Sequence, residues 1–158
     1  MTATESTTAE AVVALSDVRK TYELGGTVTA LDDVSLSLAE GSYTAVMGPS
    51  GSGKSTLLNL IGGLDTPDDG SVRVGGQHLG AASERDRAAV RGTEIGFVFQ
   101  TFNLMPRLTA VENVALPLVF QGWSRDERRA RAEEQLADVG LGDRLNHQPT
   151  ELSGGQRQ

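Results

Sequence analysis

The 158-residue sequence contains no cysteine, which excludes disulfide bonds and thiolate metal sites. Lysine is almost as scarce, because Lys20 and Lys54 are the only two and the other basic residues are arginines. With 21 acidic and 14 basic residues, the formal net charge is −7. A charge of this sign argues against nucleic acid as the main partner, so we expect none.

Long apolar runs are also missing from the sequence. No stretch approaches the roughly 20 apolar residues that a membrane-spanning helix needs. The N-terminus lacks the basic-then-apolar order of a secretory signal. We therefore expect a cytoplasmic protein, or one that is bound to a membrane only through a partner.

The most informative stretch that is present covers residues 43–64. The apolar residues 43–47 predict a buried strand, and leucines and an isoleucine at helical spacing follow residue 56. Between them the chain fills the pattern G-x-x-x-x-G-K-S/T with Gly48, Pro49, Ser50, Gly51, Ser52, Gly53, Lys54 and Ser55. The motif thus lies between a strand and a helix, where its mechanism requires it.

Each position of this motif has a chemical reason. Backbone N–H groups of a glycine-rich turn can all point at phosphate oxygens where no Cβ intervenes, and the start of the helix adds its positive dipole end. Lys54 supplies a positive charge for the β- and γ-phosphates, and the Ser55 hydroxyl suits a Mg²⁺ ion. Thr56 can donate to the α-phosphate. The plain alternative is a glycine-rich turn that happens to contain a lysine, but the strand and helix context favours a nucleotide site.

The rest of the chain predicts a tail and two kinds of structure. Residues 1–10 are small and polar and predict a disordered tail. Further strands are expected at 11–15, 28–38, 71–74, 77–79 and 95–99, with a hairpin turn at 23–27. Helices are expected from Ser83 to about Val90, from Thr109 and from Ser124 to about Val139, and Pro117 should break or kink the second of them.

Tyr22 and Gln100 are candidate site residues that the sequence alone leaves open. Tyr22 could stack on a purine base, or it could be an ordinary strand tyrosine packed on a sheet face. Gln100 follows a predicted strand, where ligands of open α/β sheets bind, and it could accept from a metal-bound water or orient an attacking one. It could equally be a polar strand end.

Two later segments also have an interpretation. Residues 101–120 carry many apolar groups for an irregular stretch, which could form a partner-binding surface or a local core. Near the end of the chain, Ser153 is a good helix N-cap, and Gly154 and Gly155 leave backbone N–H groups bare. This is a second phosphate site, which makes sense if it serves a nucleotide held by another subunit.

Taken together, these motifs resemble the ATP-binding subunits of ABC transporters. GPSGSGKST matches the Walker A motif of the family, Phe99-Gln100 its Q-loop and LSGGQ its signature motif, in the family's order. Segments such as GGLDTPDDG look most like the macrolide-export and lipoprotein-release branch. The resemblance implies an α/β fold: a P-loop NTPase core with an antiparallel β subdomain in 11–100 and a helical subdomain in 101–158.

The resemblance also implies roles for individual residues. Tyr22 would stack on adenine, Lys54 and Gln100 would serve catalysis, and Ser55 and Gln100 would contact Mg²⁺. Two copies would face each other head to tail, so that Ser153, Gly154, Gly155 and Gln156 of one close on the ATP of the other. Residues 101–120 would dock on a transmembrane permease, which places the protein at the inner face of the membrane. Such a subunit would bind and hydrolyse ATP to power transport.

The family's Walker B strand, catalytic glutamate, D-loop and switch histidine would follow LSGGQ and are not among these 158 residues. We therefore expect an incomplete domain without steady ATP turnover by this chain alone, and too few residues to form the helix that LSGGQ opens. A non-catalytic nucleotide-binding fragment and a division-type scaffold subunit are the alternative functions. A kinase-like P-loop enzyme is disfavoured by LSGGQ.

Overall fold

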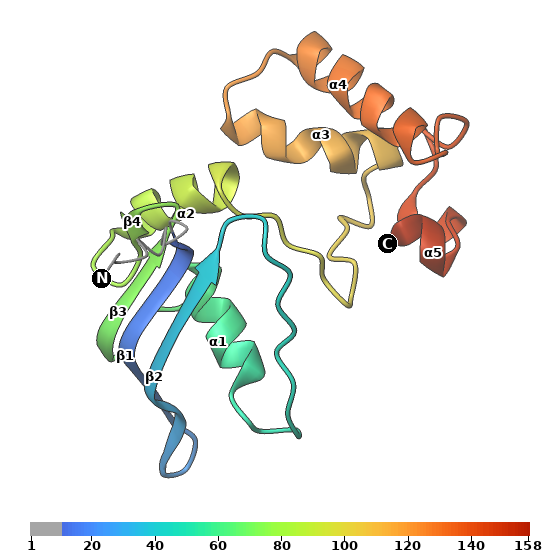
Figure 1. Cartoon of the computed structure of the whole chain (residues 1–158). Coiled ribbons are helices and arrows are strands. Elements are labelled where there is room, and N and C mark those ends of the chain that lie inside the picture. The colour runs from blue at the N-terminus through green and yellow to red at the C-terminus, as the bar shows by residue number, and fades with distance from the viewer. Residues whose placement is uncertain (1–10) are drawn as a thin grey trace, which may run out of the picture. The chain divides into compact units, whose positions relative to one another are not determined.

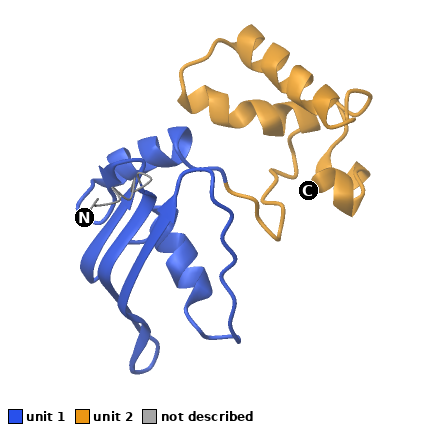
Figure 2. Cartoon of the chain, in the orientation of Figure 1, with its two compact units in different colours: residues 1–96 blue, residues 97–158 orange. Residues whose placement is uncertain are grey.

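The computed structural model describes residues 11–158, and the predicted tail at 1–10 lies outside the described residues. The chain forms two compact units, one ending at residue 96 and the other covering residues 97–158 (Figure 2). The first unit combines a sheet with helices, and the second is helical.

The sheet of the first unit has four antiparallel strands in the order β2-β1-β3-β4 (Figure 1). They are β1 (Ala11–Glu23), β2 (Thr27–Ala39), β3 (Asp69–Val74) and β4 (Gln77–His78). The four strands and the hairpin turn expected here are confirmed, although β1 is eight residues longer than the sequence predicted. The extra length matters because it carries the strand through Lys20 and Tyr22.

The core of this unit lies between the sheet and two helices, α1 (Lys54–Ile61) and α2 (Glu84–Thr93). Helix α1 contacts β2 and β3, and its Leu60 is fully buried. The buried apolar side chains come from both layers, and they are Val13, Leu15, Val18, Leu31, Leu57, Leu60, Val72, Val74, Leu79 and Val90. Ser83 caps α2 as expected by accepting from the Asp86 N–H, and this helix runs three residues beyond the predicted end.

The predictions of buried strands at 43–47 and 95–99 are wrong. Neither segment forms a strand, and their side chains are largely exposed, with Tyr43 at 98% and Val98 at 85%. A strand exists only where a neighbouring strand accepts and donates its ladder hydrogen bonds. Within residues 11–158 no segment pairs with either one.

The second unit packs α3 (Ala110–Phe120) against α4 (Arg125–Asp138). Both helices begin with the predicted capping boxes, Thr109 with Glu112 and Ser124 with Glu127. Residues from both helices and the leucine that opens the signature motif form a small separate core of Ala110, Val111, Ala132, Leu136 and Leu152. Of the expected apolar stretch 101–120, the start of α3 is therefore core, while Met105 and Phe120 are exposed.

One expectation for the helices of this unit is wrong, and another is wrong in part. Pro117 does not break α3, which continues to Phe120, so of the two outcomes expected for this proline only the kink stays a prediction. The signature motif does form a helical turn, α5 (Gly154–Arg157), after the short 3-10 helix η1 (Pro149–Glu151). A capping box between Ser153 and Gln156 supplies the bonds that so short a turn otherwise lacks.

Candidate functional site

The first unit contains a pocket of about 260 Å³ beside the start of α1. Tyr22 of β1 and residues 28–30 of β2 form one part of its lining. The predicted phosphate-loop residues form the other part, and they are Ser50, Gly51, Ser52, Gly53, Lys54, Ser55 and Thr56. The structure therefore brings Tyr22 to the same pocket as the loop, although 27 residues lie between Tyr22 and Ser50 in the sequence. Gly48 and Pro49 directly precede Ser50.

Close packing on β2 determines the backbone of the loop at Gly53. This residue caps α1 with φ +80°, a conformation that favours glycine. A Cβ placed on it would overlap the backbone carbonyl oxygen of Ala30 and lie 2.9 Å from Cδ2 of Leu31. The loop can thus approach β2 this closely only because position 53 has no side chain.

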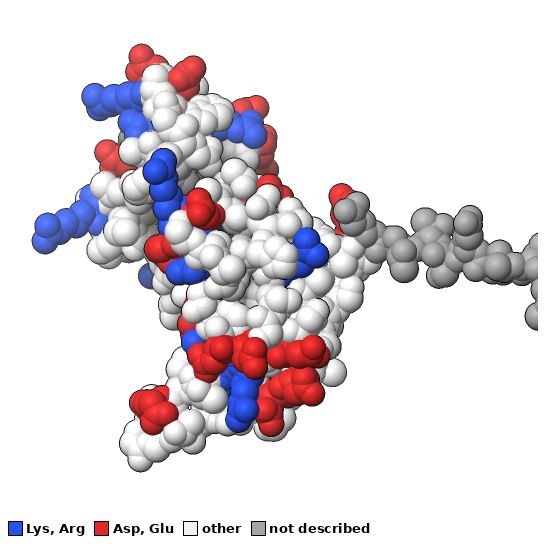
Figure 3. All heavy atoms as spheres, turned by 90° about the vertical axis from the view of Figure 1, so that its left-hand side faces the viewer, with Lys and Arg blue, Asp and Glu red and all other residues white. Residues whose placement is uncertain are grey.

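Lys54 is the only charged side chain among the described residues that line the pocket. Its ammonium donates to the carbonyl oxygens of Gly48 at 2.8 Å and Pro49 at 2.7 Å, and it lies 3.3 Å from the Ser52 hydroxyl. The face shown in Figure 3 carries both acidic and basic side chains. A single positive charge in a polar loop of an acidic protein is a local anion site.

The start of α1 adds donors to this pocket. Gly53 offers no capping side chain, so the N–H groups of the first turn have no side-chain acceptor. These groups and the positive end of the helix dipole favour phosphate oxygens. The exposed Ser55 hydroxyl has no hydrogen-bond partner among residues 11–158 and fits a magnesium ion that keeps most of its waters.

Tyr22 is half-buried, and two neighbours that sequence reasoning missed hold its side chain. Its hydroxyl donates to Oδ2 of Asp65 at 2.9 Å, and the Lys20 ammonium lies 5.3 Å from the ring centroid. The scarcity of lysine singled out Lys20, but no motif linked it to a carboxylate 45 residues away in the sequence.

Lys20 and Asp65 strengthen each other's charged forms. Burial lowers the pKa of Lys20, but Asp65, Asp68 and Tyr22 together outweigh that effect, so the pKa lies above its usual 10.5. Burial likewise raises the pKa of Asp65, while hydrogen bonds from Lys20, Thr66 and Tyr22 bring it below 3.8. The pair is therefore fully charged at neutral pH.

Of the other predicted site residues, Gly48 and Pro49 belong to the first unit and are not among the residues that line its pocket, and the rest belong to the second unit. Gln100 lies in an exposed turn and is not part of the pocket of the first unit. At the signature motif, the Ser153 hydroxyl accepts from the Gln156 N–H at 3.3 Å, and the Ser153 N–H donates to the Gln156 side chain at 2.9 Å. Gly154 and Gly155 are exposed, and a Cβ on either would meet nothing within 4 Å.

Comparison with known families matches residues 31–158 to the description "ABC transporter". The match covers the phosphate loop and the signature motif, and Tyr22 lies before it. The chain belongs to the ABC transporter family. The α/β P-loop fold class and the resemblance drawn from GPSGSGKST, Phe99-Gln100 and LSGGQ are thereby confirmed.

Individual members of the ABC transporter family are similar to most of this chain. An uncharacterized ABC transporter ATP-binding protein of Thermotoga maritima is 53% identical over 93% of the chain and 63% of its own length. The lipoprotein-releasing system ATP-binding protein LolD of Pseudomonas fluorescens is 48% identical over 94% and 66%. The macrolide export protein MacB of Rhodopseudomonas palustris is 45% identical over 95% and 23%. The chain thus spans about two thirds or less of the length of these relatives.

A solved ABC cassette has the same fold. The dimeric, post-hydrolysis structure of the ATP-binding cassette MJ0796, bound to ADP and Pi, superposes with a TM-score of 0.82 at 47% identity. The superposition covers 92% of this chain and 65% of that one. Within residues 11–158, no helix is both long enough and apolar enough to cross a bilayer.

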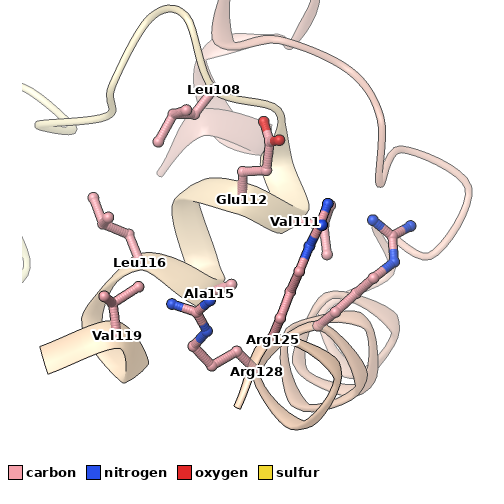
Figure 4. A pocket seen from close by; sticks show the side chains of 9 residues that line it. Leu108, Val111, Glu112, Ala115, Leu116, Val119, Arg125 and Arg128 are labelled. Atoms are coloured by element: carbon pink, nitrogen blue, oxygen red, sulfur yellow. The ribbon is translucent and has the colours of Figure 1, made fainter. Parts of the chain in front are cut away.

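The helical unit of this ABC family member has a groove of its own, with a volume of about 260 Å³ (Figure 4). Its apolar lining comes from α3 and the segment before it, and its charged lining is mainly arginine from α4. The residues are Leu108, Val111, Glu112, Ala115, Leu116, Val119, Arg125, Arg128 and Arg129. Six residues of the stretch 101–120, for which the family resemblance implies docking on a permease, line the groove.

Proposed function

We propose that this chain binds ATP in the pocket of its first unit and is the ATP-binding part of an ATPase that powers an ABC-type membrane transporter or export complex. The observation that carries the proposal is the joint lining of one pocket by Tyr22 and residues 50–56. An aromatic ring and a glycine-rich loop with one cation are the two parts that a nucleotide needs, one for the base and one for the phosphates.

Different residues of the pocket bind different parts of the nucleotide. Backbone N–H groups of residues 50–56 bind the phosphates, and Lys54 exchanges its carbonyl acceptors on Gly48 and Pro49 for the β- and γ-phosphate oxygens. Ser55 is the residue that would hold Mg²⁺, which when bound neutralises phosphate charge. Tyr22 stacks on the adenine. The relative MJ0796, whose structure holds ADP and Pi, supports a nucleotide here.

The second unit supplies the residues that act between subunits. Two copies pair head to tail, so that Ser153, Gly154, Gly155 and Gln156 of one copy contact the ATP held by the other. The dimeric state of MJ0796 supports this arrangement. Gln100 senses the bound nucleotide and Mg²⁺ and passes the change to residues 101–120, which dock on a permease. The apolar groove between α3 and α4 supports a protein partner, and such docking holds the protein at the inner face of the membrane.

Calorimetric titration of the chain with ATP tests the proposal. Replacing Lys54 with alanine removes the only cation among the described residues that line the pocket, and charge-assisted hydrogen bonds are strong enough for a loss of about 10- to 100-fold in affinity. Arg85→Ala on α2 is the control, because it also removes one positive charge but lies outside the pocket. Equal ATP affinity of Lys54→Ala and the unaltered chain would overturn the proposal.

A further inference from the structure

The Asp65 carboxylate lies in the loop that follows α1, and both of its oxygens are engaged. Oδ1 accepts from the Lys20 ammonium at 2.8 Å and from the Thr66 N–H at 2.7 Å. Oδ2 accepts from the Tyr22 hydroxyl at 2.9 Å. One carboxylate therefore connects β1 to the loop that follows α1, the helix that begins at the phosphate loop.

Lys20 constrains Tyr22 in a second way. Its side chain is buried, with the residue only 8% exposed, and its ammonium also donates to the Thr66 carbonyl oxygen at 2.8 Å. The same ammonium lies over the Tyr22 ring, 5.3 Å from the centroid. A cation on one face of the ring leaves only the other face for a base.

From these contacts we infer that Asp65 is a positioning residue, which holds the Tyr22 ring ready to stack on the nucleotide base. The inference rests on the proposed function, because Tyr22 acts on a base only if the pocket binds ATP. Asp65 fixes the hydroxyl of Tyr22 and the Lys20 ammonium covers one face of its ring. The side chain therefore loses no rotamer freedom when a base binds to the other face. Ordering such a side chain only on binding would weaken affinity by about 2- to 10-fold.

The contacts are better explained by positioning than by stability. A buried ion pair gains little over apolar side chains of the same size, because desolvation of both charges offsets their attraction. Hydrogen bonds to both oxygens do fix the orientation of the carboxylate and hence of the tyrosine hydroxyl. Lys20, Asp65 and Tyr22 thus form one network that ends at the pocket.

The experiment measures binding of ATP and of inorganic triphosphate to Asp65→Ala, Tyr22→Phe and the double variant. Tyr22→Phe removes only the hydroxyl and keeps the ring, so it tests the inference even where Asp65→Ala fails to fold. The chain offers matched controls. Asp69→Ala removes a carboxylate that, within residues 11–158, accepts only from the N–H of its neighbour Gly70, and Tyr43→Phe alters the other tyrosine, which is 98% exposed.

Each single variant is expected to bind ATP about 2- to 10-fold more weakly, with triphosphate binding and both controls unchanged. The double variant should be no weaker than either single one, because both remove the same hydrogen bond. Unchanged ATP affinity of Tyr22→Phe, additive losses, or an equal loss for triphosphate would overturn the inference and leave the proposed function standing. A chain that bound neither ligand would overturn both.

Discussion

The carbonyl oxygen of Ala30 restricts position 53 to glycine, so a substitution at this single position should lower stability. Gly53→Ala combines an unfavourable positive φ with an overlap on that oxygen, and we expect a loss of about 2–5 kcal/mol in the free energy of unfolding. Gly51→Ala is the matched control, because φ is also positive at +82° but a Cβ there meets nothing within 4 Å. Its cost should be only about 1–2 kcal/mol. Urea unfolding measures both, and equal losses would contradict the role of Ala30.

The carboxylates around Lys20 predict how stability depends on pH. Burial raises the pKa of Asp65 and the hydrogen bond from Lys20 lowers it, with a net pKa below 3.8. The Thr21 hydroxyl and N–H lower the pKa of Asp68. Because an unfolded aspartate titrates near about 3.9, these groups contribute fully above that pH, and their contribution is lost as the pH falls through the lower folded values.

Urea unfolding between pH 7 and pH 3 is expected to show this loss, and Asp65→Asn should make the dependence shallower. Some dependence should remain, because Asp68 and the paired glutamates Glu84, Glu112 and Glu127 also have lowered pKa values. An unchanged slope in Asp65→Asn would show that the Lys20 pair does not set the pH dependence.

At this scale the sequence predicts residues that a local pattern specifies. Gly53, Lys54 and Ser55 follow from their spacing alone, and the structure places them in one pocket. Lys20 and Asp65 could not be found in this way, because their pairing depends on how β1 packs beside the end of α1. Tyr22 lay between the two cases, since only the family resemblance favoured stacking over packing.

At the scale of helices, the capping boxes are the features with the clearest energetic consequence. Thr109→Ala removes the acceptor for the Glu112 N–H and a donor to its carboxylate, and should cost about 0.5–2 kcal/mol of stability in the helical unit. Thr150→Ala, an exposed threonine in η1, should change stability by less than about 0.5 kcal/mol. Hydrogen exchange of the α3 amides measures the difference, and faster exchange in both variants would argue against the cap.

Helices and strands differ in how far the sequence predicted them. The starts of α2, α3 and α4 were predicted correctly because caps act within four residues of the chain. The apolar runs 43–47 and 95–99 have strand-like composition but no ladder partner in the described chain. Composition shows that a segment suits a sheet, whereas pairing depends on distant residues.

At the scale of the whole molecule, the two units have separate cores. Leu60 belongs to the cluster of the first unit and Leu136 to that of the second, and no residue is shared. We expect Leu60→Ala and Leu136→Ala each to destabilise by about 2–5 kcal/mol, and each to speed hydrogen exchange in its own unit. Leu136→Ala should leave ATP affinity unchanged. Equal acceleration of exchange throughout the chain by either variant would instead show one cooperative unit.

The phosphate loop binds its own lysine, so a nucleotide has to displace hydrogen bonds that already exist in the loop. The Lys54 ammonium already saturates its donors on two carbonyl oxygens and a hydroxyl of residues 48–52. An incoming phosphate therefore competes with these loop oxygens for the Lys54 ammonium. The measured affinity is the difference between the two sets of hydrogen bonds. Replacing Lys54 by a residue without an ammonium also removes these hydrogen bonds within the loop. We therefore expect limited proteolysis to cleave the loop of such a variant faster than that of the unaltered chain, even without nucleotide.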